Sequence, residues 1–230
     1  MIVICDGMPR SGSTWAFNVC LRLVRLRWPG ANVYCGFRQW IGEYLNEMGP
    51  EHDHAVLKTH RLDTEGMALS LTAGVRSIHT YRDPYDAVFS FLSLFDPDFE
   101  TALQALRNAL VTRAFHFAYG NALMVPYHRI RRAPTRTIRD IADYLGVALG
   151  PEQVSLIHAE TGFQKVKDWS STIGDDPSRE VVRLREMAFD PETNFHRNHI
   201  RDGRSGNGRR MLTPQQKRMV SDLLNHHGRT

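Results

Sequence analysis

A glycine-rich turn near the start of the chain has the residue types and spacing of an anion-binding loop. It reads Gly7-Met-Pro-Arg-Ser-Gly-Ser-Thr-Trp15. Backbone N–H groups in such a turn converge on one point at the start of a helix, where the helix dipole adds partial positive charge. The spacing nearly matches the triphosphate loop G-x-x-x-x-G-K-[ST], but Ser13 replaces the lysine that would reach the β- and γ-phosphates. The sequence therefore predicts a phosphate site for a ligand other than a nucleoside triphosphate, with a plain tight turn as the alternative.

The segments on either side of this loop predict the elements that position it. Residues Ile2–Cys5 are a short β-branched run, typical of a buried parallel strand that stops at a glycine turn. The segment after the turn has an apolar face at helical spacing, and Pro29-Gly30 ends it. That face consists of Phe17, Cys20, Leu21, Val24 and Trp28. The chain therefore opens as strand, glycine loop and helix.

The same alternation continues and predicts an α/β fold, with a central parallel sheet flanked by helices and right-handed crossovers. Further strands are expected at Ala55–Leu57, Val75–Tyr81 and Leu123–Val125, and helices at Thr64–Ala73, Pro84–Phe95 and Phe99–Tyr119. Later helices are expected at Thr135–Leu145, Pro151–Glu160, Ser178–Met187 and from Pro214 onward. Thr213 and Gln216 have the spacing of a capping box before that last helix. The segment Phe195–Arg210 is expected to be a long loop, either functional or disordered.

Composition favours a single domain over residues 1–230, because 230 residues with 42% hydrophobic content bury one full core. Cys5, Cys20 and Cys35 form no CxxC pair, which argues against a disulfide framework and against a zinc site. The sequence shows no targeting segment and no stretch of about 18 apolar residues. We therefore expect a cytoplasmic protein without a membrane partner. The net charge of +4 suits an anionic ligand, an ordinary Arg-rich enzyme or a nucleic acid.

The loop sequence PRSGSTW resembles the 5′-phosphosulfate loop of the sulfotransferases that use 3′-phosphoadenosine 5′-phosphosulfate (PAPS). The resemblance implies a P-loop sulfotransferase fold, similar to that of nucleotide kinases. It also implies PAPS as the donor and adenosine 3′,5′-bisphosphate as the product. Donor binding is implied for Arg10, Ser11, Gly12, Ser13, Thr14 and Trp15. For Trp15, an adenine platform and a core residue at the helix start remain equal alternatives.

Further segments resemble the same family in its order along the chain. Tyr81–Ser90 is similar to the family's 3′-phosphate motif, which implies that Arg82 and Ser90 grip the phosphate that distinguishes PAPS from ATP. The triplet Lys58-Thr59-His60 resembles the segment that supplies the histidine general base in cytosolic members. The resemblance implies adenine contacts for Tyr127, Thr161 and Phe163, and a loop closing over the 3′-phosphate for Arg201, Asp202 and Gly203.

Two positions depart from the family pattern. Cytosolic members carry a lysine where Arg10 stands; an arginine stabilises negative charge but is a poor proton donor. The C-terminal motif usually continues Gly-Asp-Trp-Lys, whereas here it reads Gly206-Asn-Gly-Arg209. The missing tryptophan leaves open how this loop closes.

Sulfuryl transfer requires a base for the acceptor hydroxyl and cations where charge builds on the leaving phosphate. We expect His60 to take the acceptor proton, and Arg10 and Lys58 to stabilise the phosphosulfate. No carboxylate pattern suggests a bound metal. The expected acceptor is a small phenol or lipophilic alcohol, in a pocket whose aromatic residues are each equally well explained as core. These residues are Phe37, Trp40, Phe91, Phe95 and Trp169.

Two rival functions remain open at this point. A P-loop metabolite kinase shares the first loop, but the lysine is missing and no clear aspartate supports Mg²⁺. A nucleic-acid-binding module is suggested by the Arg-rich segments 129–139 and 197–210, which lack interleaved aromatic residues for base stacking. We expect no nucleic-acid partner and leave a homodimer open.

Overall fold

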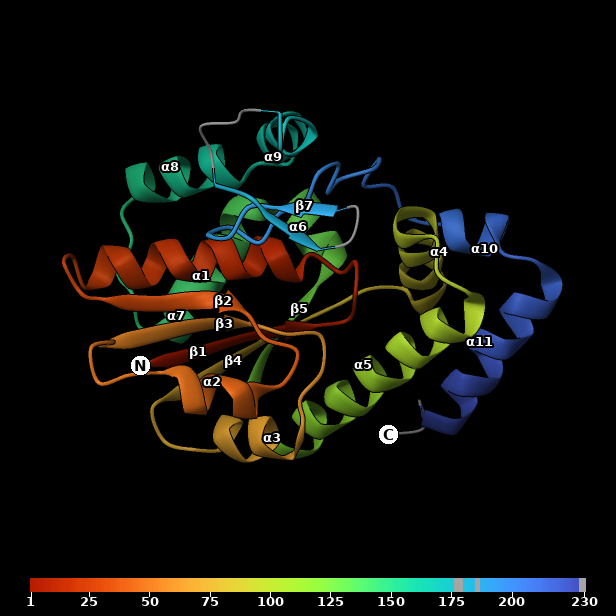
Figure 1. Ribbon diagram of the computed structural model, residues 1–230, viewed down its shortest axis with the longest axis horizontal. Coiled ribbons are helices and arrows are strands. Elements are labelled where there is room, and N and C mark those ends of the chain that lie inside the picture. The colour runs from red at the N-terminus through yellow and green to blue at the C-terminus, as the bar shows by residue number, and fades with distance from the viewer. Residues whose placement is uncertain (176–179, 185–186, 228–230) are drawn as a thin grey trace.

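Five parallel strands form the central sheet in the computed structural model, which describes residues 1–175, 180–184 and 187–227 (Figure 1). Their order across the sheet is β2-β3-β1-β4-β5. The strands are β1 (Ile2–Gly7), β2 (Val33–Phe37), β3 (His54–Lys58), β4 (Val75–Tyr81) and β5 (Ala122–Pro126). Because all five run in one direction, their carboxyl ends meet at one edge of the sheet, where α/β proteins bind ligands.

Helices cover both faces of this sheet, which explains why the strands read as continuous apolar runs. Along β1, Val3 and Cys5 face one side and Ile4 faces the other, as the alternation of a strand requires. The first side is covered by α1 (Ser13–Arg27), α7 (Pro134–Leu145) and α8 (Pro151–Thr161). The second side is covered by α2 (Ile41–Glu47), α3 (Thr64–Ser70) and part of α5 (Phe99–Tyr119).

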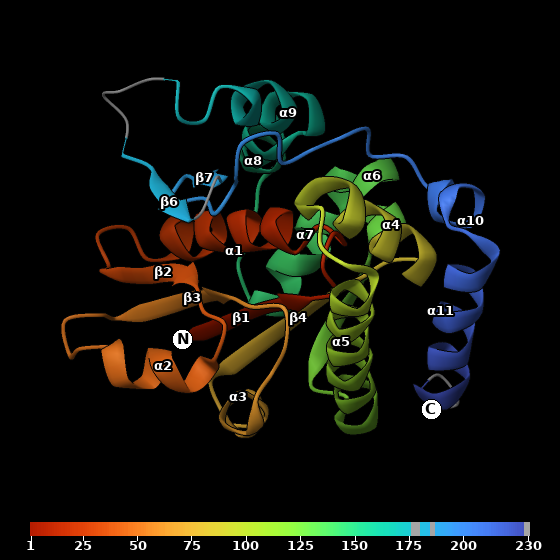
Figure 2. The same ribbon diagram turned by 45° about the vertical axis from the view of Figure 1, so that its right-hand side comes forward.

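The remaining helices build the surroundings of the sheet's carboxyl edge. Helices α4 (Pro84–Phe95), α10 (Asn207–Met211) and α11 (Pro214–His227) pack with α5 around a second apolar cluster beside the sheet (Figure 2). Helices α6 (Tyr127–Arg132) and α9 (Phe163–Ser171) and the hairpin of β6 (Val182–Leu184) and β7 (Met187–Phe189) lie near the start of α1.

The predicted α/β fold with a parallel sheet is confirmed, and four of the five strands lie where the apolar runs indicated. The edge strand β2 was missed because its sequence, VYCGF, is only partly buried and contains Gly36, so it shows no continuous apolar run. The helix expected at 178–187 is wrong over Val182–Leu184, where the chain pairs with β7. Apolar residues alternate with Arg183 there, which is a strand period. Residues 178–179 and 185–186 of that expected helix lie outside the described residues.

The predicted capping box is present before α11. Thr213 N donates to Gln216 Oε1 at 2.9 Å, and Gln216 N donates to Thr213 Oγ1 at 3.2 Å. Within the described parts of the chain, no helix has the length and apolarity to cross a membrane.

Candidate active site

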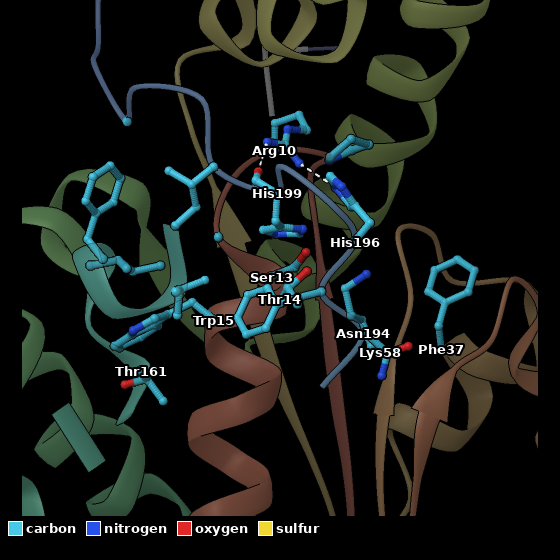
Figure 3. Close-up of a pocket in the computed structure, with 18 of the residues that line it drawn as sticks. Arg10, Ser13, Thr14, Trp15, Phe37, Lys58, Thr161, Asn194, His196 and His199 are labelled. Atoms are coloured by element: carbon cyan, nitrogen blue, oxygen red, sulfur yellow. Dashed lines mark hydrogen bonds between the residues drawn. The ribbon is translucent and has the colours of Figure 1, made fainter. Parts of the chain in front are cut away.

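A cavity of about 700 Å³ lies over the carboxyl ends of β1, β3 and β4 and the start of α1 (Figure 3). It brings together residues that stand far apart in the sequence. Of the residues that the sequence analysis assigned to donor binding or catalysis, those lining the cavity are Arg10, Gly12, Ser13, Thr14, Trp15, Lys58, His60, Arg82, Ser90, Tyr127, Thr161, Phe163, Arg201, Asp202 and Gly203.

The glycine-rich loop presents backbone N–H groups to this cavity. Helix α1 begins at Ser13, and its N-cap is Gly12, with φ of 90°. A glycine has no side chain to bond the first helical amides, so those of Ser13 and Thr14 are left for a ligand. No acidic residue lies in the first turn of α1, which leaves the positive end of the helix dipole uncompensated. The start of α1 is therefore an anion site.

Ser11 joins the glycine-rich loop to strand β4. Its side chain is fully buried, and its hydroxyl lies 2.7 Å from Thr80 Oγ1 and 3.0 Å from the main-chain oxygen of Thr80 on β4. At Gly7, an added Cβ would stand 2.1 Å from the same Thr80 hydroxyl. Ser11 therefore differs from the other loop residues expected to bind the donor, because its hydroxyl is directed into the sheet.

Arg10 occupies the centre of the cavity with an unusual backbone conformation, φ of 66°. Its Nε lies 3.3 Å from Ser90 Oγ, and its main-chain oxygen accepts from Arg82 Nη1 at 3.3 Å. Burial lowers the pKa of Arg10 to about 10, and Arg82 and Arg201 act in the same direction against Tyr127. Three guanidinium groups thus converge on one cavity, an arrangement that a polyanionic ligand would stabilise.

Lys58 and His60 stand at the end of β3, beside the glycine-rich loop. Lys58 is 6% exposed, and its Nζ lies 4.8 Å from the centre of the Phe37 ring. Burial, followed by the charge of Arg10, lowers the pKa of Lys58 to about 7. Burial and the neighbouring Lys58 lower the pKa of His60 to about 3. His60 is therefore a neutral imidazole at neutral pH.

Arg82 links the glycine-rich loop to residues 201–209, here called the C-terminal loop. Besides its contact with the Arg10 main chain, it donates through Nη2 to the main-chain oxygen of Arg204 at 2.5 Å. Its guanidinium lies 4.4 Å from the centre of the Tyr127 ring. Its Nε is buried and has no hydrogen-bond partner among the described residues. An unsatisfied buried donor on a cation indicates that an acceptor belongs there.

The carboxylate of Asp86 holds the C-terminal loop against α4 through two main-chain N–H groups. Asp86 accepts from Gly206 N at 2.7 Å and from Gly208 N at 2.8 Å. A Cβ at Gly208 would stand 2.1 Å from the Tyr85 main-chain oxygen, so only glycine permits this approach. Asp202 ties the loop to itself by accepting from Arg204 N at 3.0 Å. The loop closes through these main-chain bonds where the family pattern has a tryptophan.

The side expected to bind adenine is lined by aromatic and small residues. Phe163 stacks on the Arg131 guanidinium at 3.5 Å, and an added Cβ at Gly203 would stand 2.5 Å from its ring. The Thr161 hydroxyl donates to Ile157 O at 2.7 Å in its own helix. Trp15 lines the cavity and also packs against the apolar cluster beside α1, so its position is compatible with both alternatives.

Comparison with known proteins identifies the family of this chain. The model of the sulfotransferase domain matches residues 2–224 of the chain. This chain belongs to the sulfotransferase domain family. No curated protein sequence matches it as a relative.

Solved sulfotransferase structures have the same fold. A mouse sulfotransferase, SULT7A1, complexed with PAP has a TM-score of 0.67 at 17% identity, over 99% of this chain and 83% of that one. A retinol dehydratase in complex with androsterone and the inactive cofactor PAP has a TM-score of 0.63 at 17% identity, over 99% of this chain and 80% of that one. The expected sulfotransferase fold and enzyme class are thus confirmed, and the kinase and nucleic-acid alternatives fall away.

The side of the cavity expected to bind the acceptor contains only some of the predicted aromatic residues. Phe37, Phe91 and Phe95 line the cavity as expected. Trp40 instead stacks on the Arg61 guanidinium at 3.6 Å, and Trp169 packs edge-on against Phe195 beside a smaller second cavity. Neither tryptophan lines the cavity: Trp40 lies directly before α2 and Trp169 lies within α9, and both side chains pack against other residues. Spacing along the chain does not reveal these directions.

The cavity residues that the sequence analysis missed include Asn194, His196 and His199 (Figure 3). His196 is 4% exposed and packs between the rings of Phe95 and Phe189, with centroids 5.7 and 5.8 Å away. The available signal was a pair of histidines three residues apart directly before Arg201-Asp-Gly203. With eleven histidines in the chain, that signal was too weak to single them out.

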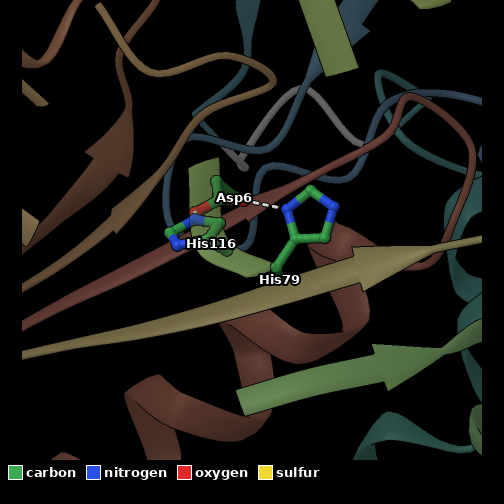
Figure 4. A group of neighbouring side chains, drawn as sticks. All are labelled: Asp6, His79 and His116. Carbon is green, nitrogen blue, oxygen red and sulfur yellow. Dashed lines mark hydrogen bonds and ion pairs between the residues drawn. The ribbon is translucent and has the colours of Figure 1, made fainter. Parts of the chain in front are cut away.

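A second polar cluster, also missed, lies beneath the glycine-rich loop (Figure 4). Asp6 of β1 contacts His79 Nδ1 of β4 and accepts from His116 Nε2 of α5 at 2.8 Å, and all three side chains are fully buried. Asn121 donates its amide to Ser70 Oγ at 3.0 Å, so its Oδ1 accepts from His116 Nδ1 at 2.9 Å. Both nitrogens of His116 therefore donate, which requires an imidazolium.

The pKa values of this cluster agree with an ion pair. Burial favours a neutral Asp6, but His79 and His116 outweigh it and lower its pKa to about 2. Burial would lower the pKa of His116, yet the Asp6 carboxylate raises it. Asp6 contacts His79 Nδ1 and His116 Nε2 directly, so we interpret the cluster as an ion pair supporting the loop.

Proposed function

We propose that this sulfotransferase transfers the sulfuryl group of PAPS to the hydroxyl of a small apolar acceptor, with His60 as general base. The observation that carries the proposal is one cavity in which cationic side chains gather beside the first amides of α1. These side chains are Arg10, Lys58, Arg82 and Arg201. Such a concentration of positive charge suits a donor that carries both a phosphosulfate and a 3′-phosphate. The solved relatives hold PAP, the corresponding product.

The proposed chemistry follows from the residues beside the first amides of α1. The acceptor O–H gives its proton to His60 Nε2 while the acceptor oxygen forms a bond to sulfur. The bond between sulfur and the bridging oxygen breaks, and its electron pair stays on the leaving 5′-phosphate. Lys58, Arg10 and the amides of Ser13 and Thr14 stabilise the charge that grows there. No step requires a metal.

The aromatic wall supports the acceptor class. Phe37, Phe91 and Phe95 form it next to His60, and ring centroids of Phe37 and His60 lie 5.8 Å apart. Such a wall favours a phenol or a lipophilic alcohol, whose hydroxyl points to the base. A retinol dehydratase with the same fold was solved with androsterone, a small molecule.

The test is calorimetric titration with adenosine 3′,5′-bisphosphate in EDTA. We expect binding near micromolar Kd, abolished in Arg82→Ala and retained in the matched control Arg107→Ala, which changes an exposed arginine of α5. Retention of binding in Arg82→Ala, or binding of Mg-ATP in place of the bisphosphate, would contradict the proposal. Activity is then measured with PAPS and 4-nitrophenol.

A further inference from the structure

The segment 190–199 packs against the glycine-rich loop and is tightly anchored. Asn18 of α1 donates to the main-chain oxygen of Thr193 at 2.8 Å, and Asp190 accepts from Thr193 N at 2.7 Å. Further along, Arg197 N donates to Ala188 O and Asn198 N donates to Ser170 O, both at 3.0 Å. Bonds to α1, β7 and α9 thus fix this segment before it reaches the C-terminal loop.

This segment supplies two of the three acceptors that hold the Arg10 guanidinium (Figure 3). Arg10 Nη2 donates to the main-chain oxygen of His199 at 2.6 Å, and Arg10 Nη1 lies 3.4 Å from His196 Nε2. The third acceptor is Ser90 Oγ of α4, 3.3 Å from Arg10 Nε. Each guanidinium nitrogen therefore has its own partner, which a lysine ammonium in the same place could not reproduce.

The hydrogen bonds of His196 define which nitrogen faces Arg10 as an acceptor. His196 Nδ1 lies 2.9 Å from the main-chain oxygen of Arg197. A carbonyl oxygen only accepts, so Nδ1 carries the proton and Nε2 offers a lone pair to Arg10. The rings of Phe95 and Phe189 hold the imidazole in this orientation. Burial, with the charge of Arg10, lowers the pKa of His196 to about 4, so the neutral form persists at neutral pH.

We propose that His196 is a positioning residue that orients Arg10 toward the bond broken in transfer, an inference that rests on the proposed sulfuryl transfer. An arginine free to change rotamer would spend little time aligned with the bridging oxygen. Fixed donors stabilise developing charge without reorganisation during the reaction. His196 thus orients Arg10, which stands where cytosolic relatives carry a lysine.

The test compares His196→Leu, which removes the acceptor, with His196→Gln, whose Oε1 can still accept from Arg10. With PAPS and 4-nitrophenol we expect His196→Leu to lower kcat about 10- to 100-fold with KM for PAPS changed less than about threefold. His196→Gln recovers kcat to within about fivefold of the wild type. The matched control is His226→Gln, an exposed histidine of α11, which leaves kcat unchanged.

A double-mutant cycle separates positioning from simple loss of packing. In the Arg10→Lys background, we expect His196→Leu to lower kcat less than about twofold, since the guanidinium it orients is gone. The inference would be overturned if His196→Leu lowered kcat equally in the wild-type and Arg10→Lys backgrounds. It would also be overturned if His196→Gln were no more active than His196→Leu. Thermal unfolding of each variant verifies that the comparison is between folded proteins.

A readout independent of turnover keeps the inference distinguishable from the proposed function. Nitrogen-15 NMR of the wild-type histidines at pH 7 should give the Nδ1–H tautomer for His196, with a shift at Nε2 when Arg10 is changed to Met. The opposite tautomer, or an Nε2 signal indifferent to Arg10→Met, would refute the positioning role. Absence of PAPS turnover and of adenosine 3′,5′-bisphosphate binding, with the NMR result as expected, would refute the proposed function alone.

Discussion

His60 Nε2 lies 3.5 Å from Lys58 Nζ, while His60 Nδ1 lies 3.0 Å from the main-chain oxygen of Gly7. Because that carbonyl can only accept, Nδ1 carries the proton and Nε2 holds the lone pair. The ammonium of Lys58 donates to this lone pair in the structure. Release of Lys58 toward an anionic donor would expose the base, so the two residues are coupled across the phosphate site.

Replacement of His60 by alanine tests the base directly. We expect kcat with PAPS and 4-nitrophenol to fall about 10²- to 10⁴-fold, because the variant lacks the proposed general base. Binding of adenosine 3′,5′-bisphosphate should change little, since the base faces the acceptor. The control is His226→Ala on the exposed face of α11. A kcat near the wild-type value in His60→Ala would assign the base elsewhere.

Donor binding should be accompanied by proton uptake at Lys58. Its pKa of about 7 leaves the free amine mostly neutral at pH 8, and a phosphosulfate or 5′-phosphate beside it favours the charged form. Titration of adenosine 3′,5′-bisphosphate at pH 8 in two buffers of different ionisation enthalpy measures this uptake. We expect up to about one proton in the wild type and close to none in Lys58→Arg, since arginine stays charged. Equal proton uptake by the wild type and Lys58→Arg would exclude Lys58 as the group that takes up the proton.

Asp86 should control donor affinity without touching the donor. The change Asp86→Asn places an amide against the N–H groups of Gly206 and Gly208, so the C-terminal loop loses its anchor. We expect adenosine 3′,5′-bisphosphate to bind on the order of 10-fold more weakly, as loss of a buried charged acceptor implies. Calorimetry on Asp86→Asn and on Asp222→Asn, an exposed control on α11, provides the comparison. Unchanged affinity in Asp86→Asn would mean that the loop closes without this carboxylate.

The Asp6 and His116 ion pair predicts a pH dependence of stability. Because its folded pKa is raised, His116 stabilises the fold fully below its unfolded pKa of about 6.5, and this contribution is lost as pH rises through the folded value. Asp6, with a folded pKa of about 2, contributes above the unfolded value of about 3.9, and its contribution disappears as pH falls toward 2.

Urea unfolding of the wild type and His116→Gln between pH 5 and pH 9 measures the His116 contribution. We expect the difference in unfolding free energy between the two proteins to be largest near pH 5 and to shrink as pH rises. His60 and His196 have pKa values that are lowered in the fold, so they make stability rise with pH. Because both proteins contain them, their effect cancels in the difference between the two unfolding free energies. A difference that stays constant with pH would exclude a charged His116.

Features governed by neighbouring residues were predictable from the sequence. The glycine-rich loop, the helix behind it and the Lys58-Thr-His60 triplet each combine residue types and short spacings that local hydrogen bonding and strand or helix periodicity explain. Arg82 and Ser90 both reach the cavity because Arg82 directly follows β4 and Ser90 lies in the middle of the next helix, α4. These patterns predicted four of the five strands, the glycine-rich loop at the start of α1 and about half of the residues that line the cavity.

Tertiary structure decided the contacts between distant segments. His196 meets Arg10 across 186 positions and His116 meets Asp6 across 110, and neither pairing leaves a periodic trace in the sequence. Trp40, Trp169 and Phe37 are all aromatic residues that the sequence analysis predicted for the acceptor pocket. Of these three, only Phe37 lines the cavity. Ser11 belongs to the loop motif, yet its hydroxyl bonds Thr80 in the sheet. The direction of a side chain depends on the path of the whole chain, which residue types and spacing do not encode locally.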